Sequence, residues 1–450
     1  MSTPASRLVC SGCGSSPPDD EPFPFRCPRA SVGDVDHVLV RLLDPDQCGF
    51  PPQATATTAP ASFVAYRRLF HSYWRAAAGG IGDEDLVELL RGLDARVAAV
   101  DGHGFAPTPL FRSDVLSDAL GFVAPGGVWV KDETGNVSGS HKARHLMGVL
   151  VHLAISEQLG LSDPAQRPQL AIASCGNAAL AAAVVAAAGS WPLTVFVPPD
   201  ADAAIMKRLS DLGAEICTCE RHPGEFGDPC YLRLLEALER GAIPFTCQGN
   251  LNGLAIEGGE TLGYEIVSSL AAHGAAVDHV VVQVGGGALA SSCAQAFSEA
   301  RALGAFEDLP RLHTVQTTGA HPLERAYRRV QTLLDGPARG DLDEALSHAA
   351  SHRSSYMWPW EQEPRSIAHG ILDDETYDWL AVVRAMITTG GEALVVTEET
   401  LRGANELARS AGFDVDPTGS AGLAGLIDLI ASGRVHPDER ALVLCTGVRR

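Results

Sequence analysis

Lysine is nearly absent from this chain. It occurs three times in 450 residues, at positions 131, 142 and 207, against thirty-one arginines. Arginine can replace lysine in most solvated ion pairs, but its guanidinium group stays protonated and cannot act as an amine nucleophile. A chain that avoids lysine can therefore keep one for covalent chemistry, although a lysine such as Lys142 is also a common surface cation at the start of a helix.

Positive charge and long apolar runs are scarce as well. The formal net charge of −21 argues against a nucleic-acid partner, because phosphate binding requires a basic surface. The longest apolar run, residues 178–189, is far shorter than the roughly 20 residues that a transmembrane helix needs. The N-terminal residues lack the apolar core of a leader peptide, so we expect a cytoplasmic protein whose eleven cysteines remain thiols.

Short apolar runs alternate with stretches of helical character along most of the chain. The expected strands are 128–130, 169–173, 193–197, 215–218, 279–284, 312–316 and 442–445. The expected helices include 63–77, 83–100, 140–153 and 288–300. This alternation predicts an α/β fold with parallel sheets covered on both faces, and the length predicts two to three domains.

Five motifs occur in a fixed order around and after Lys142. They are Lys131-Asp-Glu with Ser140-His-Lys142, Ala173-Ser-Cys-Gly-Asn177, Glu257-Gly-Gly-Glu-Thr261 with Gly263-Tyr-Glu265, Val284-Gly-Gly-Gly-Ala-Leu289, and Leu444-Cys-Thr-Gly447. Together they resemble the signatures of the pyridoxal-phosphate enzymes of fold type II, the tryptophan synthase β family. The third and fifth motifs are similar to those of its threonine synthase branch.

The resemblance covers about residues 105–450 and implies the fold type II architecture. In that architecture two open, twisted, mainly parallel sheet domains hold the cofactor in the cleft between them. We expect a smaller domain at about 140–240, inserted in a larger domain formed by about 105–139 and 241–450. Residues 51–104 are expected to form a linker and a helical extension. The family also implies a homodimer.

The first two motifs supply the expected reactive groups. The resemblance implies that Lys142 forms the Schiff base with pyridoxal phosphate and later moves a proton at the Cα of an amino-acid substrate. Asn177 would bind the 3′ oxygen of the cofactor, although an asparagine at this point could also cap a helix. Ser174, Cys175 and Gly176 would bind the substrate carboxylate.

The glycine motif follows an expected strand and precedes an expected helix. Backbone N–H groups at such a junction bind phosphate, but the same pattern also occurs in tight turns and dinucleotide sites. The position of the motif after Lys142 favours pyridoxal phosphate, with Gly285, Gly286, Gly287 and Ala288 at the phosphate. His141 would contact the same phosphate or pack in the core.

The C-terminal motif places a neutral hydroxyl at the cofactor. By resemblance, Thr446 faces the pyridine nitrogen, and Ser420 is either a second contact or a helix cap. A neutral hydroxyl does not keep that nitrogen protonated, so elimination should compete well against transamination. Among the motif carboxylates we expect a structural role for Glu265, while Glu257 could be structural or an acid-base group.

Several residues depart from the threonine synthase pattern. His141 resembles tryptophan synthase β, His145 replaces an expected glycine, and Cys175 stands where relatives usually carry serine or threonine. We therefore expect a lyase acting on an amino acid with a β- or γ-leaving group such as O-phosphohomoserine. The alternatives are a threonine or serine ammonia-lyase, a cysteine or tryptophan synthase type of replacement, a role in secondary metabolism, or a non-catalytic paralogue. A second phosphate pocket has three candidates, Arg144, Lys207 and Arg208.

Residues 1–50 carry a damaged metal-binding pattern. Three cysteines, Cys10, Cys13 and Cys27, resemble the zinc ribbon that begins some threonine synthases. Structural zinc needs four ligands, and Ala30 stands where the fourth cysteine would be. His37 or Cys48 could replace it, but no spacing requires either. The sequence therefore favours a metal-free remnant that binds less than one zinc per chain.

Overall fold

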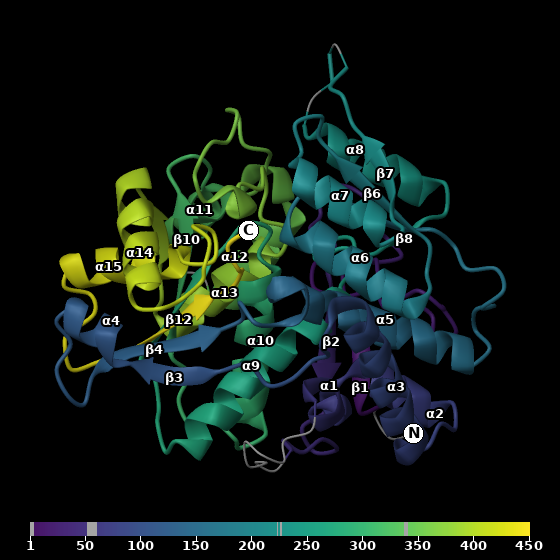
Figure 1. The fold of residues 1–450 in the computed structure, drawn as a ribbon, viewed down its shortest axis with the longest axis horizontal. Helices are drawn as coiled ribbons and strands as arrows, with labels where there is room; N and C mark the ends of the chain where they lie inside the picture. The colour runs from purple at the N-terminus through teal and green to yellow at the C-terminus, as the bar shows by residue number, and fades with distance from the viewer. Residues whose placement is uncertain (1–3, 52–60, 223, 226, 337–340) are drawn as a thin grey trace. The chain divides into compact units, whose positions relative to one another are not determined.

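A computed structural model describes residues 4–51, 61–222, 224–225, 227–336 and 341–450 (Figure 1). Most of the linker expected at the start of residues 51–104 lies outside the described residues. Among the described residues, no helix combines the length and the apolar character needed to cross a bilayer.

The chain divides into two compact units. Unit 1 comprises Met1–Ala30, His37–Pro107 and Asn136–Thr261, and unit 2 comprises Ser31–Asp36, Thr108–Gly135 and Leu262–Arg450. The sequence placed the inserted domain at about 140–240, whereas unit 1 continues to residue 261 and includes most of the N-terminal region.

Close helix packing explains why unit 1 extends this far. The first turns of α9 (Leu254–Ala272) pack against α5 (Lys142–Gln158) inside unit 1. A Cβ on Gly258 would overlap the carbonyl oxygen of Arg144, and a Cβ on Gly148 would lie 2.6 Å from the Cα of Gly258. Such an approach needs glycine on both helices, so this part of α9 is fixed to α5.

Unit 1 is built on a sheet of four parallel strands in the order β7-β6-β5-β8. Its strands are β5 Leu170–Ala173, β6 Leu193–Val197, β7 Glu215–Thr218 and β8 Ile243–Pro244. The helices α6 Asn177–Gly189, α7 Ala203–Asp211 and α8 Pro229–Glu239 follow β5, β6 and β7 in turn. The alanine- and valine-rich α6 is buried on nearly every face, as expected for a helix that is apolar all round.

The N-terminal part of unit 1 adds a small sheet and several helices. These elements are β1 Ser6–Cys10, β2 Leu39–Leu43, α1 Ser62–Ala65, η1 Arg67–Leu69, α2 His71–Ala78 and α3 Asp83–Asp101. The short helix η2 Val137–Gly139 comes directly before α5. β1 and β2 are antiparallel, with Cys10 opposite Leu39.

The helix expected over 63–77 is interrupted. Phe70 is buried and extended at φ −97° and ψ 140°, and the Glu257 carboxylate accepts the N–H of His71 at 2.5 Å. Glu257, which is distant in sequence, therefore caps the start of α2, and the helix breaks at Phe70 although the local sequence pattern is helical.

Unit 2 is built on a six-stranded sheet in the order β11-β10-β9-β12-β4-β3. Five strands are parallel and the edge strand β3 is antiparallel to β4. The strands are β3 Leu110–Ser113, β4 Gly127–Asp132, β9 His279–Gln283, β10 Arg311–Thr317, β11 Ala393–Val396 and β12 Arg440–Cys445. The helices are α4 Asp114–Ala119, α10 Ala288–Ala302, α11 Pro322–Leu334, α12 Leu342–Ser351, η3 Arg353–Ser355, η4 His369–Ile371, α13 Trp379–Thr389, α14 Glu398–Ser410 and α15 Ala421–Ala431.

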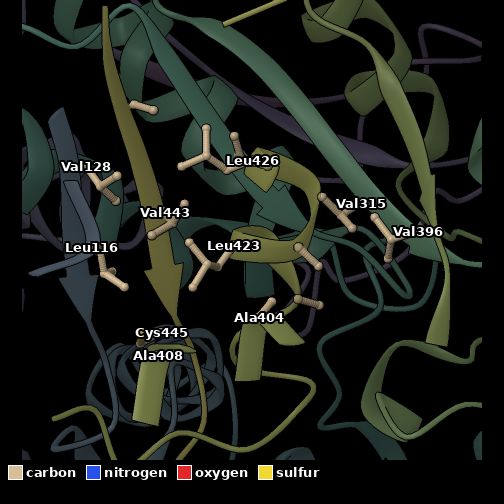
Figure 2. Packing of buried hydrophobic residues seen from close by; sticks show 14 of the residues in the cluster. Leu116, Val128, Val315, Val396, Ala404, Ala408, Leu423, Leu426, Val443 and Cys445 are labelled. Atoms are coloured by element: carbon tan, nitrogen blue, oxygen red, sulfur yellow. The ribbon is translucent and has the colours of Figure 1, made fainter. Parts of the chain in front are cut away.

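One apolar core of unit 2 lies between this sheet and α14 and α15. Figure 2 shows Leu423 and Leu426 of α15 among Val128, Val443 and Val315 from the strands. All five side chains are nearly or fully buried. The two sheets and their covering helices confirm the expected fold: a mainly parallel α/β architecture in two domains.

Candidate active site

The three lysines have very different surroundings. Lys131 is fully buried in β4, and its Nζ lies 2.6 Å from the Glu265 carboxylate. Lys207 is 75% exposed and pairs with Asp211, four residues along the same helix. Lys142 is half-buried at the first position of α5, and its ammonium group forms no hydrogen bond or ion pair with any described residue. Lys142 is therefore the lysine whose amine remains available for chemistry.

A strained turn precedes Lys142. Ser138 adopts the left-handed conformation at φ 56° and ψ 17°, and Gly139 follows at φ 67°. A non-glycine residue in this region costs about 1 kcal/mol or more and persists where the surrounding structure holds it. Asp101 supplies that hold by accepting the Ser138 N–H at 2.8 Å, while Asn136 donates to the Ser140 carbonyl at 3.2 Å. The turn fixes where α5 begins.

Polar groups at the helix starts fit an anionic ligand. Ser140 is fully buried, and its Oγ has no hydrogen-bond partner among the described residues. Within the described residues, no side chain caps the N-termini of α5, α6 or α10, which begin at Lys142, Asn177 and Ala288. Uncapped N–H groups and the positive end of the helix dipole suit a phosphate or carboxylate. Each of these helix starts, taken by itself, therefore has groups that suit the anionic phosphate of pyridoxal phosphate.

His145 is a neutral, buried imidazole one turn after Lys142. Burial, followed by the positive charge of Lys142, lowers the pKa of His145 to about 3. Its Nδ1 lies 2.8 Å from the Ala255 carbonyl, which can only accept, so Nδ1 carries the hydrogen and Nε2 is an acceptor. Among the described residues that Nε2 has no partner. The ring stacks edge-on with His141 at 5.8 Å between centroids.

The second motif forms the turn between β5 and α6. Gly176 occupies the N-cap position, so Asn177 is the first helical residue and its side chain is not the cap. Cys175 is exposed and Ser174 is half-buried, with its Oγ 3.4 Å from the Gly176 N–H. The turn therefore presents a thiol, a hydroxyl and backbone donors at the surface of unit 1.

The glycine motif of unit 2 is packed tightly from behind. A Cβ on Gly285 would overlap the Asp373 carboxylate, and one on Gly286 would lie 2.8 Å from the Tyr377 ring. Gly287 has φ 97°, where side chains are strained. These glycines are required by the segment around residues 371–378, whatever ligand the loop binds.

Thr446 is held by an amide that the sequence did not single out. The buried Gln283 Nε2 donates to the Thr446 Oγ1 at 2.7 Å and to the carbonyls of Gly419 and Leu444 at 2.8 and 3.2 Å. Because the two carbonyl oxygens can only accept, the side-chain atom of Gln283 that faces them must be the nitrogen. The Thr446 oxygen therefore accepts from Gln283, and its own hydrogen must point elsewhere. The signal in the sequence that could have identified Gln283 is its polar amide at the end of the apolar strand β9.

Ser420 is engaged within its own loop. Its hydroxyl donates to the Asp416 carbonyl at 3.0 Å and accepts from the Asn405 side chain at 2.9 Å. Ser420 stands at the N-cap position of α15, but its side chain forms no capping hydrogen bond with the described residues of the helix.

Glu257 and Glu265 of the third motif both make structural contacts. Glu265 pairs with Lys131 and accepts the N–H of Thr108 at 3.0 Å, in agreement with the expected structural role. Glu257 starts α2 and lies 3.5 Å from the Arg41 Nε. Burial raises the pKa of Glu257 to about 7.

The three candidates for a second phosphate pocket have different surroundings. Arg144 is buried and donates to the Thr261 hydroxyl at 3.1 Å. Lys207 and Arg208 lie on the exposed helix α7, with side chains 75% and 48% exposed.

Comparisons with known proteins identify the family of the chain. The model of the pyridoxal-phosphate dependent enzyme family matches residues 103–447. Threonine synthase from Methanosarcina acetivorans is 28% identical over 344 residues, covering 76% of this chain and 74% of the relative. Cysteate synthase from Methanoregula boonei is 26% identical over 348 residues, covering 75% and 74%. The structure of maize serine racemase has a TM-score of 0.58 at 18% identity over 81% of this chain and 93% of that one, a likeness of fold. The chain belongs to the family of pyridoxal-phosphate dependent enzymes.

Proposed function

We propose that this enzyme catalyses elimination or replacement on an amino acid bearing a β- or γ-leaving group, as a lyase of threonine synthase type. The observation that carries the proposal is the half-buried, unpaired Lys142 in a chain whose other two lysines are paired with carboxylates. Curated relatives named threonine synthase and cysteate synthase support reactions of this class.

In unit 1, Lys142 would bind the cofactor and move the proton at the substrate Cα. The task requires a free amine, and among the described residues no carboxylate pairs with Lys142. Pyridoxal phosphate, when bound, withdraws electrons from the substrate Cα. Asn177 would orient the cofactor, and the turn formed by Ser174, Cys175 and Gly176 would bind the substrate carboxylate.

In unit 2, Thr446 would donate a hydrogen bond to the pyridine nitrogen. Gln283 supports this role because its amide donates to the Thr446 oxygen, so the hydroxyl hydrogen is not used in that bond. A donor on that nitrogen keeps it unprotonated, which disfavours transamination. The N–H groups at residues 285–288 would bind the phosphate, and the resemblance also gives His141 of unit 1 as a phosphate contact.

β-Replacement is a second candidate. Arg144 is engaged with Thr261, and Lys207 is engaged with Asp211. A substrate whose leaving group needs no dedicated basic pocket would suit this arrangement, and the similarity to cysteate synthase supports the same class.

Borohydride reduction and peptide mapping test the cofactor site. We expect the purified protein to absorb in the visible range and to carry the pyridoxyl adduct on Lys142. A screen of amino acids and O-phospho-amino acids for shifts of the absorption band would then identify the substrate, and product analysis would separate elimination from replacement. An adduct on Lys131 or Lys207 would overturn the assignment of Lys142.

A further inference from the structure

Four potential metal ligands converge at one end of the small sheet in unit 1. The ligand atoms of Cys10, Cys13, Cys27 and His37 all lie within 4.8 Å of one another. The Cys10 Sγ is 3.6 Å from the His37 Nδ1, and the Cys13 Sγ is 3.5 Å from the Cys27 Sγ. Ligands at about 2.3 Å from a tetrahedral zinc are about 3.8 Å apart, so the observed separations are close to those of a zinc site.

The cysteines are not joined by disulfides. Cys10, Cys13 and Cys27 are free thiols, and the 3.5 Å between Cys13 and Cys27 is far longer than the S–S bond of about 2.05 Å. The thiols are thus close enough to share an ion and too far apart to be bonded.

The register of the small sheet brings His37 to the cysteines. β1 ends at Cys10, which is opposite Leu39, and the Ser11 N–H donates to the Val38 carbonyl at 2.8 Å. His37 precedes β2 by two residues, so the antiparallel pairing places it beside the end of β1. Twenty-seven positions separate Cys10 and His37, and no sequence spacing could have revealed their contact.

Two tight turns present the cysteine sulfurs. The Gly14 N–H donates to the Cys10 carbonyl at 2.9 Å, which closes the turn from Cys10 to Cys13. The Ala30 N–H donates to the Cys27 carbonyl at 2.9 Å, and the Arg29 N–H points at the Cys27 Sγ at 3.3 Å. N–H groups directed at sulfur stabilise a thiolate ligand. Ala30 therefore completes the turn, although it supplies no ligand.

We propose that Cys10, Cys13, Cys27 and His37 bind one structural zinc ion through three thiolates and the His37 Nδ1. Three thiols would each release a proton to solvent on binding. Sulfur and imidazole ligands in a closed set of four suit zinc, with no position left for substrate. A two-stranded sheet is marginally stable alone, so the ion would hold β1 and β2 together. This proposal is independent of the proposed reaction and reverses the expectation of a metal-free remnant.

Metal analysis of the reduced full-length protein tests the site. We expect about one zinc per chain in the wild type and background levels in His37→Gln and Cys13→Ser. The matched control is Cys48→Ser, because Cys48 lies outside the cluster and its Sγ contacts the Ala5 carbonyl at 3.9 Å. His37→Cys should restore one equivalent, since it recreates a four-cysteine site.

Cobalt substitution of the wild type keeps the test decisive if a variant fails to fold. The cobalt-loaded protein should show the visible bands of a tetrahedral site and a thiolate charge-transfer band, at one cobalt per chain. Wild-type protein that takes up neither zinc nor cobalt under reducing conditions would overturn the proposal. Full zinc in His37→Gln would show that His37 is not a ligand. Cofactor loading and turnover are measured separately, so a failure of the proposed reaction does not affect this result.

Discussion

Unit 1 and unit 2 each contain a lysine that is at least partly buried, and the two lysines differ in whether a carboxylate pairs with them. In unit 2, Lys131 is completely buried, and its charge is balanced by Glu265 and by the carbonyl of Thr108. In unit 1, eleven positions later, Lys142 is partly buried and has no carboxylate partner among the described residues. A buried ammonium normally requires a counter-charge. The presence of a carboxylate partner therefore distinguishes Lys131, which has a structural role, from Lys142, whose amine is available for chemistry.

Replacing Lys142 should have the largest effect. Lys142→Arg keeps the positive charge but removes the nucleophilic amine, so turnover should fall by about 10³-fold or more. The unfolding midpoint in urea should change little, because the ammonium has no partner to lose. Lys207→Arg serves as the control and should keep its activity. Comparable turnover in the two variants would remove the distinction between the lysines.

Replacing Lys131 should damage the fold. Lys131→Met leaves the Glu265 carboxylate buried without its counter-charge, which should cost about 3–5 kcal/mol of unfolding free energy. The double variant Lys131→Met with Glu265→Gln should recover part of that loss, since no charge is then stranded. Urea unfolding of the three proteins measures the difference. If the single variant unfolds like the wild type, the ion pair has no structural role.

The charge of Lys142 should also be visible in the titration of His145. Burial and the Lys142 charge hold the pKa of His145 at about 3, so NMR should show a neutral ring down to about pH 4. Lys142→Met removes one of the causes that lower the His145 pKa and should raise it, whereas Lys131→Met should leave it unchanged.

The same histidine predicts a pH-dependent loss of stability. The pKa of His145 is lowered in the folded protein, so its contribution to stability is complete above the unfolded pKa of about 6.5 and decreases as the pH falls toward 3. At pH 5 the loss is about 2 kcal/mol. His145→Gln cannot be protonated, so its stability relative to wild type should improve by that amount between pH 7 and pH 5. A constant difference between the two proteins would mean that the ring titrates normally.

The smallest effect is expected at Thr446. Thr446→Ser keeps the hydroxyl that Gln283 orients, so the ratio of lyase products to transamination products should barely change. Thr446→Asp should keep the pyridine nitrogen protonated and raise transamination. Keto acid, ammonia and pyridoxamine phosphate are measured with the substrate found by screening. Extensive transamination by the wild type would argue against the elimination assignment.

Local patterns predicted much of the fold, and distant contacts account for the rest. The expected strands correspond to β4, β5, β6, β7, β9, β10 and β12, because apolar runs of this length are local signals. The break before α2 depends on Glu257, which is 186 positions from His71. The contacts of His37 with Cys10 and of Gln283 with Thr446 likewise depend on strand register and sheet order. No spacing rule encodes those contacts.

The packing of residues 285–287 changes how a mutational scan of this enzyme should be interpreted. Substitution of any of the three glycines would disturb the segment around residues 371–378 or strain the backbone, even in a protein that never meets a phosphate. Low tolerance in the scan would therefore report on folding at these positions and on ligand binding at once. Ser140, whose hydroxyl is buried and unpartnered among the described residues, is the more informative position, because Ser140→Ala removes a polar atom without adding bulk.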